Sequence, residues 1–278
     1  LIIAGTTSYP FELDFAAFRD VADSVGAWLV ADISHISGLV VGGEHPSPVP
    51  HCDVVMTTTH KTLRGPRGAA ILVTERGLDR DPKLGRAIDS AIIPGLQGGP
   101  HNATTAGIAL AAAEAARPEF TAYARQVRAN ADALASALQN KGLKLVGDGT
   151  ENHLMVIDLT PRSIGLGTQV AYAMDVAGMY ANRNAIPNEP ASPFYPSGIR
   201  LGTPLVTTRG MKEGEMEKIA GWIARVIEEV GDATLPTDKK ERSRFVREFK
   251  KKADANVTLQ AIRREVVDTA QGFPLFTW

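Results

Sequence analysis

A lysine at the end of an apolar, strand-like run is the residue best suited to chemistry in this chain. The run Asp53–Met56 leads into three threonines, His60 and Lys61, and a turn rich in Gly, Pro and Arg follows. Burying an unpaired ammonium group is costly, so a lysine at this place indicates an amine that acts as a nucleophile or is held as an imine. The basic turn, which contains Arg67, is either structural or binds an anionic group.

Asp32 ends a second apolar run and lies 29 residues before Lys61. If the two runs are adjacent strands, the carboxylate and the amine lie at the same edge of the sheet. The pair is then either a structural ion pair or a pyridoxal phosphate site, in which the lysine forms the imine and the aspartate keeps the ring nitrogen protonated. His35 and His60 are either core histidines or groups that tune a proton transfer beside the lysine.

Two later segments carry further candidates for polar recognition. Gly98 and Gly99 lie in a Gly/Pro-dense loop, where they either form a tight turn or present backbone N–H groups to a phosphate. Arg200 lies between apolar residues and glycines, and a carboxylate is the best geometric partner for an arginine in such a place. That partner is either an internal Asp or Glu or the α-carboxylate of an amino-acid substrate.

The elements that must position these residues alternate between strand and helix over the first hundred residues. Helical periodicity covers 14–25, and apolar runs predict strands at 1–5, 27–32, 54–57 and 69–74. Continuous apolar strands between helices predict an α/β sheet covered on both faces. Ligands of such sheets bind at the carboxyl ends of the strands, where Asp32, His35, His60 and Lys61 fall.

The second half of the chain is richer in helix signals. Patterns predict a strand at 154–159, an irregular loop at 182–204, and helices at 103–140, 168–176, 211–229 and 238–254. Arg117-Pro118 breaks the first of these helices and marks the expected domain boundary. The helix at 238–254 carries eight basic residues against four acidic ones, and we interpret it as an amphipathic helix with a solvated basic face rather than a nucleic-acid site.

The composition is that of a globular protein without a bias toward polyanions. The net charge is −1, so neither nucleic acid nor an anionic membrane is expected as a partner. The single cysteine, Cys52, excludes an intrachain disulfide and fits a reducing, cytoplasmic compartment. It also has no thiol partner for a metal, and no metal site is expected. Because Leu1–Gly5 indicates a core strand with no lead-in, we expect a C-terminal part of a longer polypeptide.

Six segments, in order along the chain, resemble the serine hydroxymethyltransferase family of fold-type-I pyridoxal phosphate enzymes. The most specific is Thr57-Thr-Thr-His-Lys-Thr-Leu-Arg-Gly-Pro-Arg-Gly68, and the others are 31–39, 45–50, 94–100, 151–154 and 197–204, followed by a similar Phe-Pro-Leu-Phe ending at 273–276. The resemblance implies an α/β fold with a mainly parallel sheet flanked by helices. Residues 1–115 would form the C-terminal portion of the cofactor-binding large domain, and 116–278 an α+β small domain.

The resemblance also implies a role for each matching residue. Lys61 would hold the cofactor as an imine, Asp32 would pair with the ring nitrogen, and His35 would lie on the phenolic-oxygen side of the ring. Further contacts to the cofactor are implied for Thr7, Thr58, His60 and Arg67. Gly98 and Gly99 would bind the cofactor phosphate of the neighbouring subunit. Arg200 would bind the substrate carboxylate, and Asn184 would contact the folate pterin. Of these, Thr58 and His60 would assist proton and imine exchange.

The activity implied is reversible transfer of the serine hydroxymethyl group to tetrahydrofolate, which gives glycine and 5,10-methylenetetrahydrofolate. A homodimer, or a dimer of such dimers, is implied as well. The family's N-terminal part, which this chain lacks, supplies a glutamate acid/base, so the resemblance implies that the chain alone is catalytically incomplete. The alternatives are a related aldol-type enzyme (an α-methylserine hydroxymethyltransferase, a threonine aldolase or a transaldolase) and a catalytically incompetent fragment or partner subunit.

Overall fold

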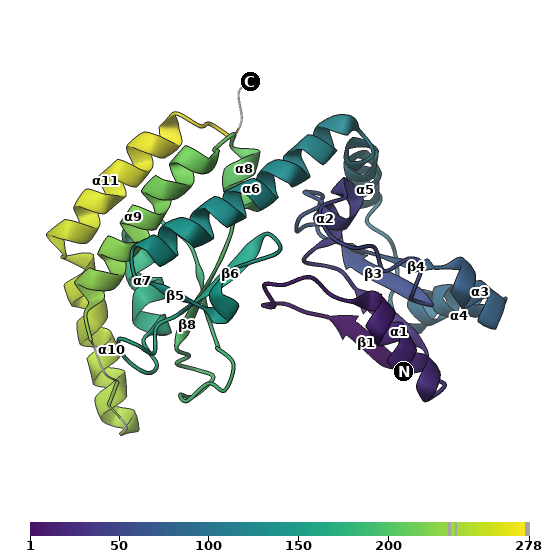
Figure 1. Cartoon of the computed structure of the whole chain (residues 1–278), viewed down its shortest axis with the longest axis horizontal. Helices are drawn as coiled ribbons and strands as arrows, with labels where there is room; N and C mark the ends of the chain where they lie inside the picture. Colours follow the sequence, from purple (N-terminus) through teal and green to yellow (C-terminus); the bar gives the residue numbers. More distant parts are fainter. Residues whose placement is uncertain (233–234, 237, 276–278) are drawn as a thin grey trace. The chain divides into compact units, whose positions relative to one another are not determined.

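The chain folds into two compact units, each with a hydrophobic core of its own (Figure 1). The computed structural model describes residues 1–232, 235–236 and 238–275. Unit 1 comprises Leu1–Thr7 and Phe11–Arg125, and unit 2 comprises Ser8–Pro10 and the described residues from Gln126 onward. The last residue of the Phe-Pro-Leu-Phe ending, Phe276, lies outside the described residues.

Unit 1 is built on a four-stranded sheet in the order β1-β2-β3-β4. The strands are β1 (Ile2–Gly5), β2 (Leu29–Asp32), β3 (Val54–Thr58) and β4 (Ala69–Val73). β1, β2 and β3 run parallel, and β4 pairs antiparallel with β3. The four strands predicted from apolar runs are confirmed, and the α/β fold with them. Because β2 and β3 are parallel neighbours, their carboxyl ends lie at the same edge.

One face of this sheet is covered by α1 (Phe15–Ser24), which packs Phe15 and Ala22 against Ala31 and Val55. Asp14 caps this helix by accepting a 2.9 Å hydrogen bond from the Ala17 N–H, so the chain enters the helix at a fixed place. The other helical segments of unit 1 are α2 (Ser37–Gly42), α3 (Glu75–Arg80), α4 (Leu84–Ser90), η1 (Ala91–Leu96) and α5 (Asn102–Ala115).

Helices lie on both faces of the sheet, but on the face opposite α1 the described residues cover the strands only in part. The face opposite α1 carries an apolar groove of about 330 Å³, bounded by the strands and α4. Its lining includes Trp28, Val30, Met56, Ile71 and Ile88. Side chains alternate between the two faces of a strand, and here both sets are apolar. Strands that are apolar on both faces predict a sheet that is buried on both faces, and the sequence alone does not show which residues cover the second face.

Unit 2 contains an antiparallel sheet in the order β5-β6-β8-β7. The strands are β5 (Lys144–Leu145), β6 (Leu154–Asp158), β7 (Asn182–Asn184) and β8 (Gly198–Gly202). The prediction of one irregular loop over 182–204 is wrong, because β7 and β8 both lie within it. These strands are short and contain Asn, Arg and Gly, which are not strong strand formers. Their pairing with each other and with β6 stabilises them, and this pairing cannot be seen in the local sequence.

Helices supply most of the core of unit 2. They are α6 (Pro118–Asn140), which begins in unit 1, α7 (Gly167–Val176), α8 (Pro204–Thr208), α9 (Glu213–Val230), α10 (Lys239–Asp254), α11 (Val257–Gln271) and the single turn η2 (Val146–Asp148). The break at Pro118 is confirmed, whereas α11 was not predicted. Figure 1 shows α9 and α11 side by side, and the Trp222 indole donates a 2.9 Å hydrogen bond to Glu265 across them.

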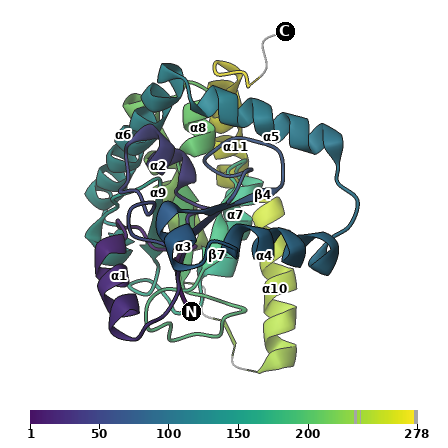
Figure 2. The same cartoon turned by 90° about the vertical axis from the view of Figure 1, so that its right-hand side faces the viewer.

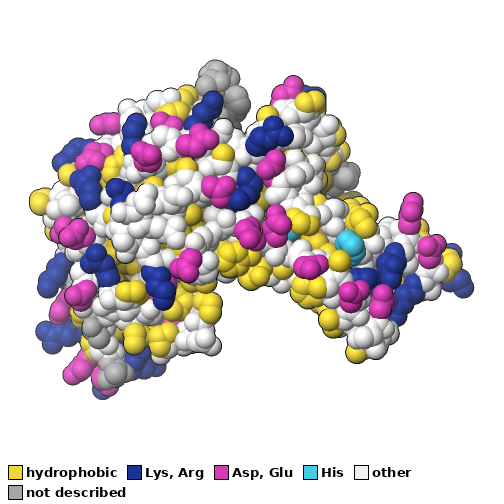
Figure 3. Space-filling model, viewed as in Figure 1, with side chains coloured by type: hydrophobic (Ala, Val, Ile, Leu, Met, Phe, Trp, Pro, Cys, Tyr) yellow, Lys and Arg dark blue, Asp and Glu magenta, His cyan; other side chains and the backbone are white. Residues whose placement is uncertain are grey.

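The basic helix α10 is amphipathic, as predicted, and packs against α7 (Figure 2). Its Phe249 and Ala253 join the core of unit 2, while Lys250 lies 4.7 Å from the centre of the Tyr172 ring. Arg244 forms a 2.8 Å ion pair with Glu248 on the exposed side. On the face of the molecule shown in Figure 3, positive and negative side chains are interleaved. None of the helices in the described ranges is both long enough and apolar enough to cross a bilayer.

Candidate active site

Lys61 lies just past the carboxyl end of β3 and is half-buried. Its Nζ donates a 2.9 Å hydrogen bond to Oγ1 of Thr58, the last residue of the strand. The loop that follows is closed by Thr59, whose hydroxyl donates to the Pro66 carbonyl at 2.6 Å and whose N–H donates to the Gly68 carbonyl at 3.0 Å. The amine is therefore held at the strand end by a closed loop.

Asp32 lies at the carboxyl end of β2, the strand next to the one that leads to Lys61. Its Oδ1 accepts two hydrogen bonds from Ser34, one from the hydroxyl at 2.5 Å and one from the N–H at 3.0 Å. The Ser34 hydroxyl in turn accepts a 3.0 Å hydrogen bond from the Thr58 N–H. The carboxylate and the amine are thus joined through Ser34 and Thr58, on two adjacent strand ends.

The turn that contains His35 is fastened to the lysine loop by Thr62. The buried Thr62 hydroxyl accepts a 2.8 Å hydrogen bond from the Gly38 N–H and donates one of 3.0 Å to the His35 carbonyl. A Cβ atom at Gly38 would overlap the Thr62 carbonyl, so only glycine allows this approach. The half-buried His35 ring is therefore placed at the same edge of the sheet as Lys61.

His60, the residue before Lys61, carries a buried polar atom. Arg67 Nη1 lies 3.4 Å from His60 Nε2, and because a guanidinium is only a donor, Nε2 is the acceptor and Nδ1 carries the proton. That Nδ1 is buried and has no hydrogen-bond partner within the described chain. Burial of the ring lowers the pKa of His60, and the positive charges of Arg67 and Lys61 lower it further. The ring is therefore neutral at neutral pH.

Three further predicted site residues of unit 1 are exposed. Thr7 follows β1, and Gly98 and Gly99 lie between η1 and α5. A Cβ atom at either glycine would meet no other atom within 4 Å, so the backbone of this loop is accessible. In the part of the chain that the structure describes, no hydrogen bond joins these glycines to Lys61 or Asp32.

In unit 2, Arg200 lies on β8 and is half-buried. Its Nη1 donates a 3.3 Å hydrogen bond to the Ser8 hydroxyl, which itself donates a 2.9 Å hydrogen bond to Oδ1 of Asn184. Burial lowers the pKa of Arg200, and the group stays a cation at neutral pH because arginine ordinarily titrates far above it. The two residues predicted to contact the substrate carboxylate and the pterin are thus linked through one serine.

The loop between β7 and β8 is organised by the carboxylate of Glu189. Its two oxygens accept hydrogen bonds from the N–H groups of Ile186, Ala191 and Ser197 at 3.2, 3.0 and 2.9 Å. The buried Ser197 hydroxyl donates a fourth, at 2.6 Å. Burial raises the pKa of Glu189, but these hydrogen bonds outweigh it and leave the pKa below its ordinary value. The loop that leads from Asn184 into β8 therefore depends on an ionised carboxylate.

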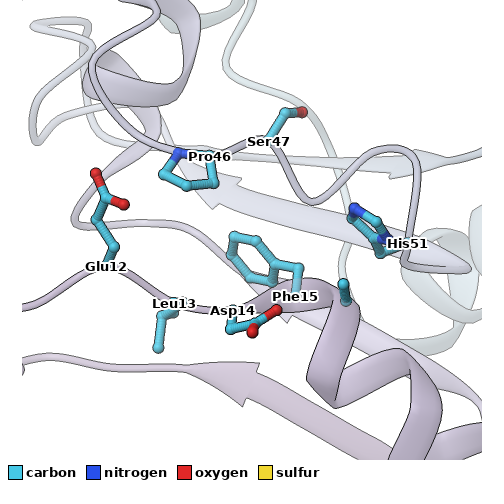
Figure 4. A pocket seen from close by; sticks show the side chains of 8 residues that line it. Glu12, Leu13, Asp14, Phe15, Pro46, Ser47 and His51 are labelled. Carbon is cyan, nitrogen blue, oxygen red and sulfur yellow. The ribbon is translucent and has the colours of Figure 1, made fainter.

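A separate pocket of about 310 Å³ lies beside the start of α1 (Figure 4). Figure 4 shows the Phe15 ring in its middle, with Glu12 at one end and His51 at the other. None of the predicted site residues lines it. No group of three or more His, Cys, Asp or Glu residues in the described ranges is arranged to hold a metal ion.

Comparison with known proteins places this arrangement in a family. The family model described as serine hydroxymethyltransferase matches residues 1–223. The chain belongs to the serine hydroxymethyltransferase family. Among named family members, a serine hydroxymethyltransferase from Sorangium cellulosum is 56% identical over 232 residues, which is 84% of this chain and 53% of that protein.

Two further relatives named serine hydroxymethyltransferase are also similar to this chain over most of its length. The one from Acidothermus cellulolyticus is 55% identical over 226 residues, or 81% of this chain and 51% of that protein. The one from Myxococcus xanthus is 46% identical over 276 residues, or 99% of this chain and 59% of that protein. The chain thus spans about half the length of the curated relatives it matches.

The serine hydroxymethyltransferase family depends on pyridoxal phosphate, and the residues present fit this cofactor. Lys61 supplies a primary amine at a strand end. Oδ2 of Asp32 has no hydrogen-bond partner among the described residues and is available to a ring N–H. The buried N–H of His60 Nδ1 is a further donor without a partner in the same part of the chain. An amine, a carboxylate and an imidazole at one edge of a sheet match the functional groups that the cofactor requires.

Sequence reasoning missed four residues that organise the candidate site, namely Ser8, Ser34, Thr62 and Glu189. One of them leaves a local signal, because Ser34 follows Asp32 by two residues, the spacing of a side chain that caps its own turn. Ser8 and Thr62 act on partners that lie far away in the sequence, and no local pattern identifies them. Glu189 acts on nearby residues of its own irregular loop, which carries no periodic pattern.

Proposed function

We propose that the full-length protein transfers the hydroxymethyl group of serine reversibly to tetrahydrofolate, giving glycine and 5,10-methylenetetrahydrofolate. Family membership supports the proposal, and one observation carries it. Lys61 and Asp32 follow adjacent parallel strands and are joined through Thr58 and Ser34. When bound, pyridoxal phosphate supplies an electron sink for the electron pair released at the substrate α-carbon.

In this proposal the residues of unit 1 hold and orient the cofactor. Lys61 is the point of attachment, and Thr58 Oγ1, 2.9 Å from its Nζ, keeps the amine directed toward the strand end. Asp32 would accept a hydrogen bond from the ring nitrogen through Oδ2, and His35 would lie on the phenolic-oxygen side. His60 is neutral at neutral pH and is therefore able both to accept and to donate a proton beside Lys61.

The residues of unit 2 bind the substrates in the same proposal. Arg200 offers its planar guanidinium to the substrate carboxylate, a match in geometry as well as charge. Fixing the carboxylate would restrict how the substrate is oriented, so the arginine would contribute orientation as well as charge. Asn184 contacts the pterin of the folate. The hydrogen bonds that Ser8 forms with Asn184 and Arg200 would fix the positions of these two residues relative to each other.

The proposal extends to assembly and location. The accessible backbone at Gly98 and Gly99 is assigned to the cofactor phosphate of a neighbouring subunit, which requires a homodimer. Thr7 and Arg67 are assigned to the cofactor site of their own subunit. The single cysteine fits a reducing compartment, and a cytoplasmic location is part of the proposal. Residues 1–115 are assigned to the large domain and 116–278 to the small domain.

A tetrahydrofolate-dependence assay tests the proposed reaction. The full-length protein, supplied with pyridoxal phosphate, should form glycine from serine only when tetrahydrofolate is present. α-Methylserine serves as the comparison substrate. If only α-methylserine is turned over, or if serine is cleaved equally well without tetrahydrofolate, the proposal is wrong and one of the related aldol-type activities takes its place.

A further inference from the structure

Ser34 lies between the two strand ends that carry the predicted cofactor contacts. It is buried, with 7% of its surface exposed. A serine hydroxyl has one proton and two lone pairs. One lone pair accepts the Thr58 N–H at 3.0 Å, and the proton is directed to Asp32 Oδ1 at 2.5 Å. The only competing acceptor among the described residues is Met56 Sδ at 3.6 Å, which is both farther away and a weaker acceptor.

The consequence for Asp32 is a fixed orientation. Oδ1 receives both the hydroxyl and the N–H of Ser34, whereas Oδ2 has no partner in the described part of the chain. The carboxylate is therefore held with Oδ1 hydrogen-bonded to Ser34 and with Oδ2 available to another donor. Since Ser34 itself is anchored on β3 through the Thr58 N–H, the orientation of Asp32 is tied to the strand that leads to Lys61.

We propose that Ser34 is a positioning residue for pyridoxal phosphate, which acts by holding Oδ2 of Asp32 toward the ring nitrogen and by fixing its distance from the Lys61 strand end. This inference rests on the proposed function. Ser34 does not touch the reacting atoms, and its effect passes through Asp32. A hydrogen bond to an ionised carboxylate is stronger than one between neutral groups, so its removal should be measurable in binding.

The test compares Ser34→Ala with Ser37→Ala in the full-length protein. Ser37 is a matched control, because it is also buried and its hydroxyl has no hydrogen-bond partner among the described residues. Ser34→Ala should weaken pyridoxal phosphate binding about tenfold, the size expected for one charge-assisted hydrogen bond, and Ser37→Ala should leave it unchanged. With ¹⁵N-labelled cofactor, the ring-nitrogen resonance should move toward that of an unprotonated ring in Ser34→Ala only.

Further variants separate positioning from folding. Ser34→Thr keeps the hydroxyl and should restore the wild-type resonance. Ser34→Cys keeps the volume but offers only a weak donor, so it replaces the alanine variant if that one does not fold. In an Asp32→Asn background, Ser34→Ala should add little, because the residue acts through the carboxylate.

The experiment distinguishes failure of the proposed function from failure of the proposed role of Ser34. If the wild-type protein binds no pyridoxal phosphate, the proposed function and this inference both fail. If the wild type binds it and Ser34→Ala, or Ser34→Cys in its place, matches the wild type in affinity and ring-nitrogen resonance, the proposed function stands and the role of Ser34 is overturned. Equal effects of Ser34→Ala and Ser37→Ala would also overturn it, since they would reflect packing alone.

Discussion

The Ser197 hydroxyl donates a 2.6 Å hydrogen bond to the carboxylate of Glu189, across the loop that connects Asn184 to β8. Three backbone N–H groups donate to the same carboxylate. One ionised side chain thus replaces the regular backbone pairing that this loop lacks. The strand that carries Arg200 begins directly after Ser197, so the order of the loop bears on the position of the arginine.

Glu189→Gln should loosen this loop in a pH-dependent way. The pKa of Glu189 is lower in the folded chain, so its stabilisation is fully present above the ordinary glutamate value and is lost as pH falls through the folded value. We expect the variant to lose about 1 kcal/mol of stability at pH 7 and to approach the wild type as pH falls through the lowered pKa of Glu189. Thermal unfolding between pH 3 and pH 8 measures the difference, and hydrogen exchange over 185–197 locates it.

The exposed Glu217, on α9, provides the control for that comparison. Glu217→Gln changes the net charge equally and should leave unfolding and exchange of the loop unchanged. A difference between Glu189→Gln and wild type that widens as the solution becomes more acidic would contradict the assignment.

Arg200→Ala should abolish binding of serine and glycine while pyridoxal phosphate still binds. Arg200→Lys keeps the charge but loses the planar two-point contact, and we expect it to weaken amino-acid binding by at least about tenfold. Ser8→Ala removes one neutral hydrogen-bond partner of the arginine and should have a smaller effect. Spectroscopic titration of the cofactor-loaded protein with each amino acid measures all three. Loss of cofactor binding together with amino-acid binding in Arg200→Ala would make the arginine structural.

Lys61→Ala should remove the visible absorbance band that develops when the full-length protein is mixed with pyridoxal phosphate. The reason is that, among the described residues, Lys61 is the one amine that Thr58 holds at this strand end. Lys83→Ala, which changes an exposed lysine of the same unit, is the matched control and should keep the band. A band of unchanged position and intensity in Lys61→Ala would mean that another residue carries the cofactor.

The sequence was sufficient to predict the parts of the site that depend on local pattern. Apolar pattern predicted that strands end at Asp32 and lead to Lys61, and both residues were expected at one edge of the sheet if these strands are adjacent. The structure meets that condition, because β2 and β3 are parallel neighbours. The break between α5 and α6 at Pro118 followed from the restriction that proline places on the preceding residue.

What the sequence could not predict depends on groups brought together by the fold. The Thr62 hydroxyl reaches the Gly38 N–H across 24 residues, and the Thr58 N–H reaches Ser34 across the same separation. β7 and β8 are short and rich in Asn, Arg and Gly, and the pairing of β8 with β7 and β6 stabilises them. In each case the deciding interaction is nonlocal, so neither propensity nor periodicity identifies it.

Cys52 is expected to react only slowly with thiol-labelling reagents. It is fully buried, and burial raises its pKa to about 11, with Arg19 lowering it and Asp53 raising it. Because the thiolate is the reactive form, the native thiol should remain inert toward maleimides at neutral pH. Within residues 1–278, a cysteine introduced at the exposed Phe194, in the loop that Glu189 organises, would then be the single site of labelling. A fluorophore placed there would report on the conformation of this loop without removal of Cys52.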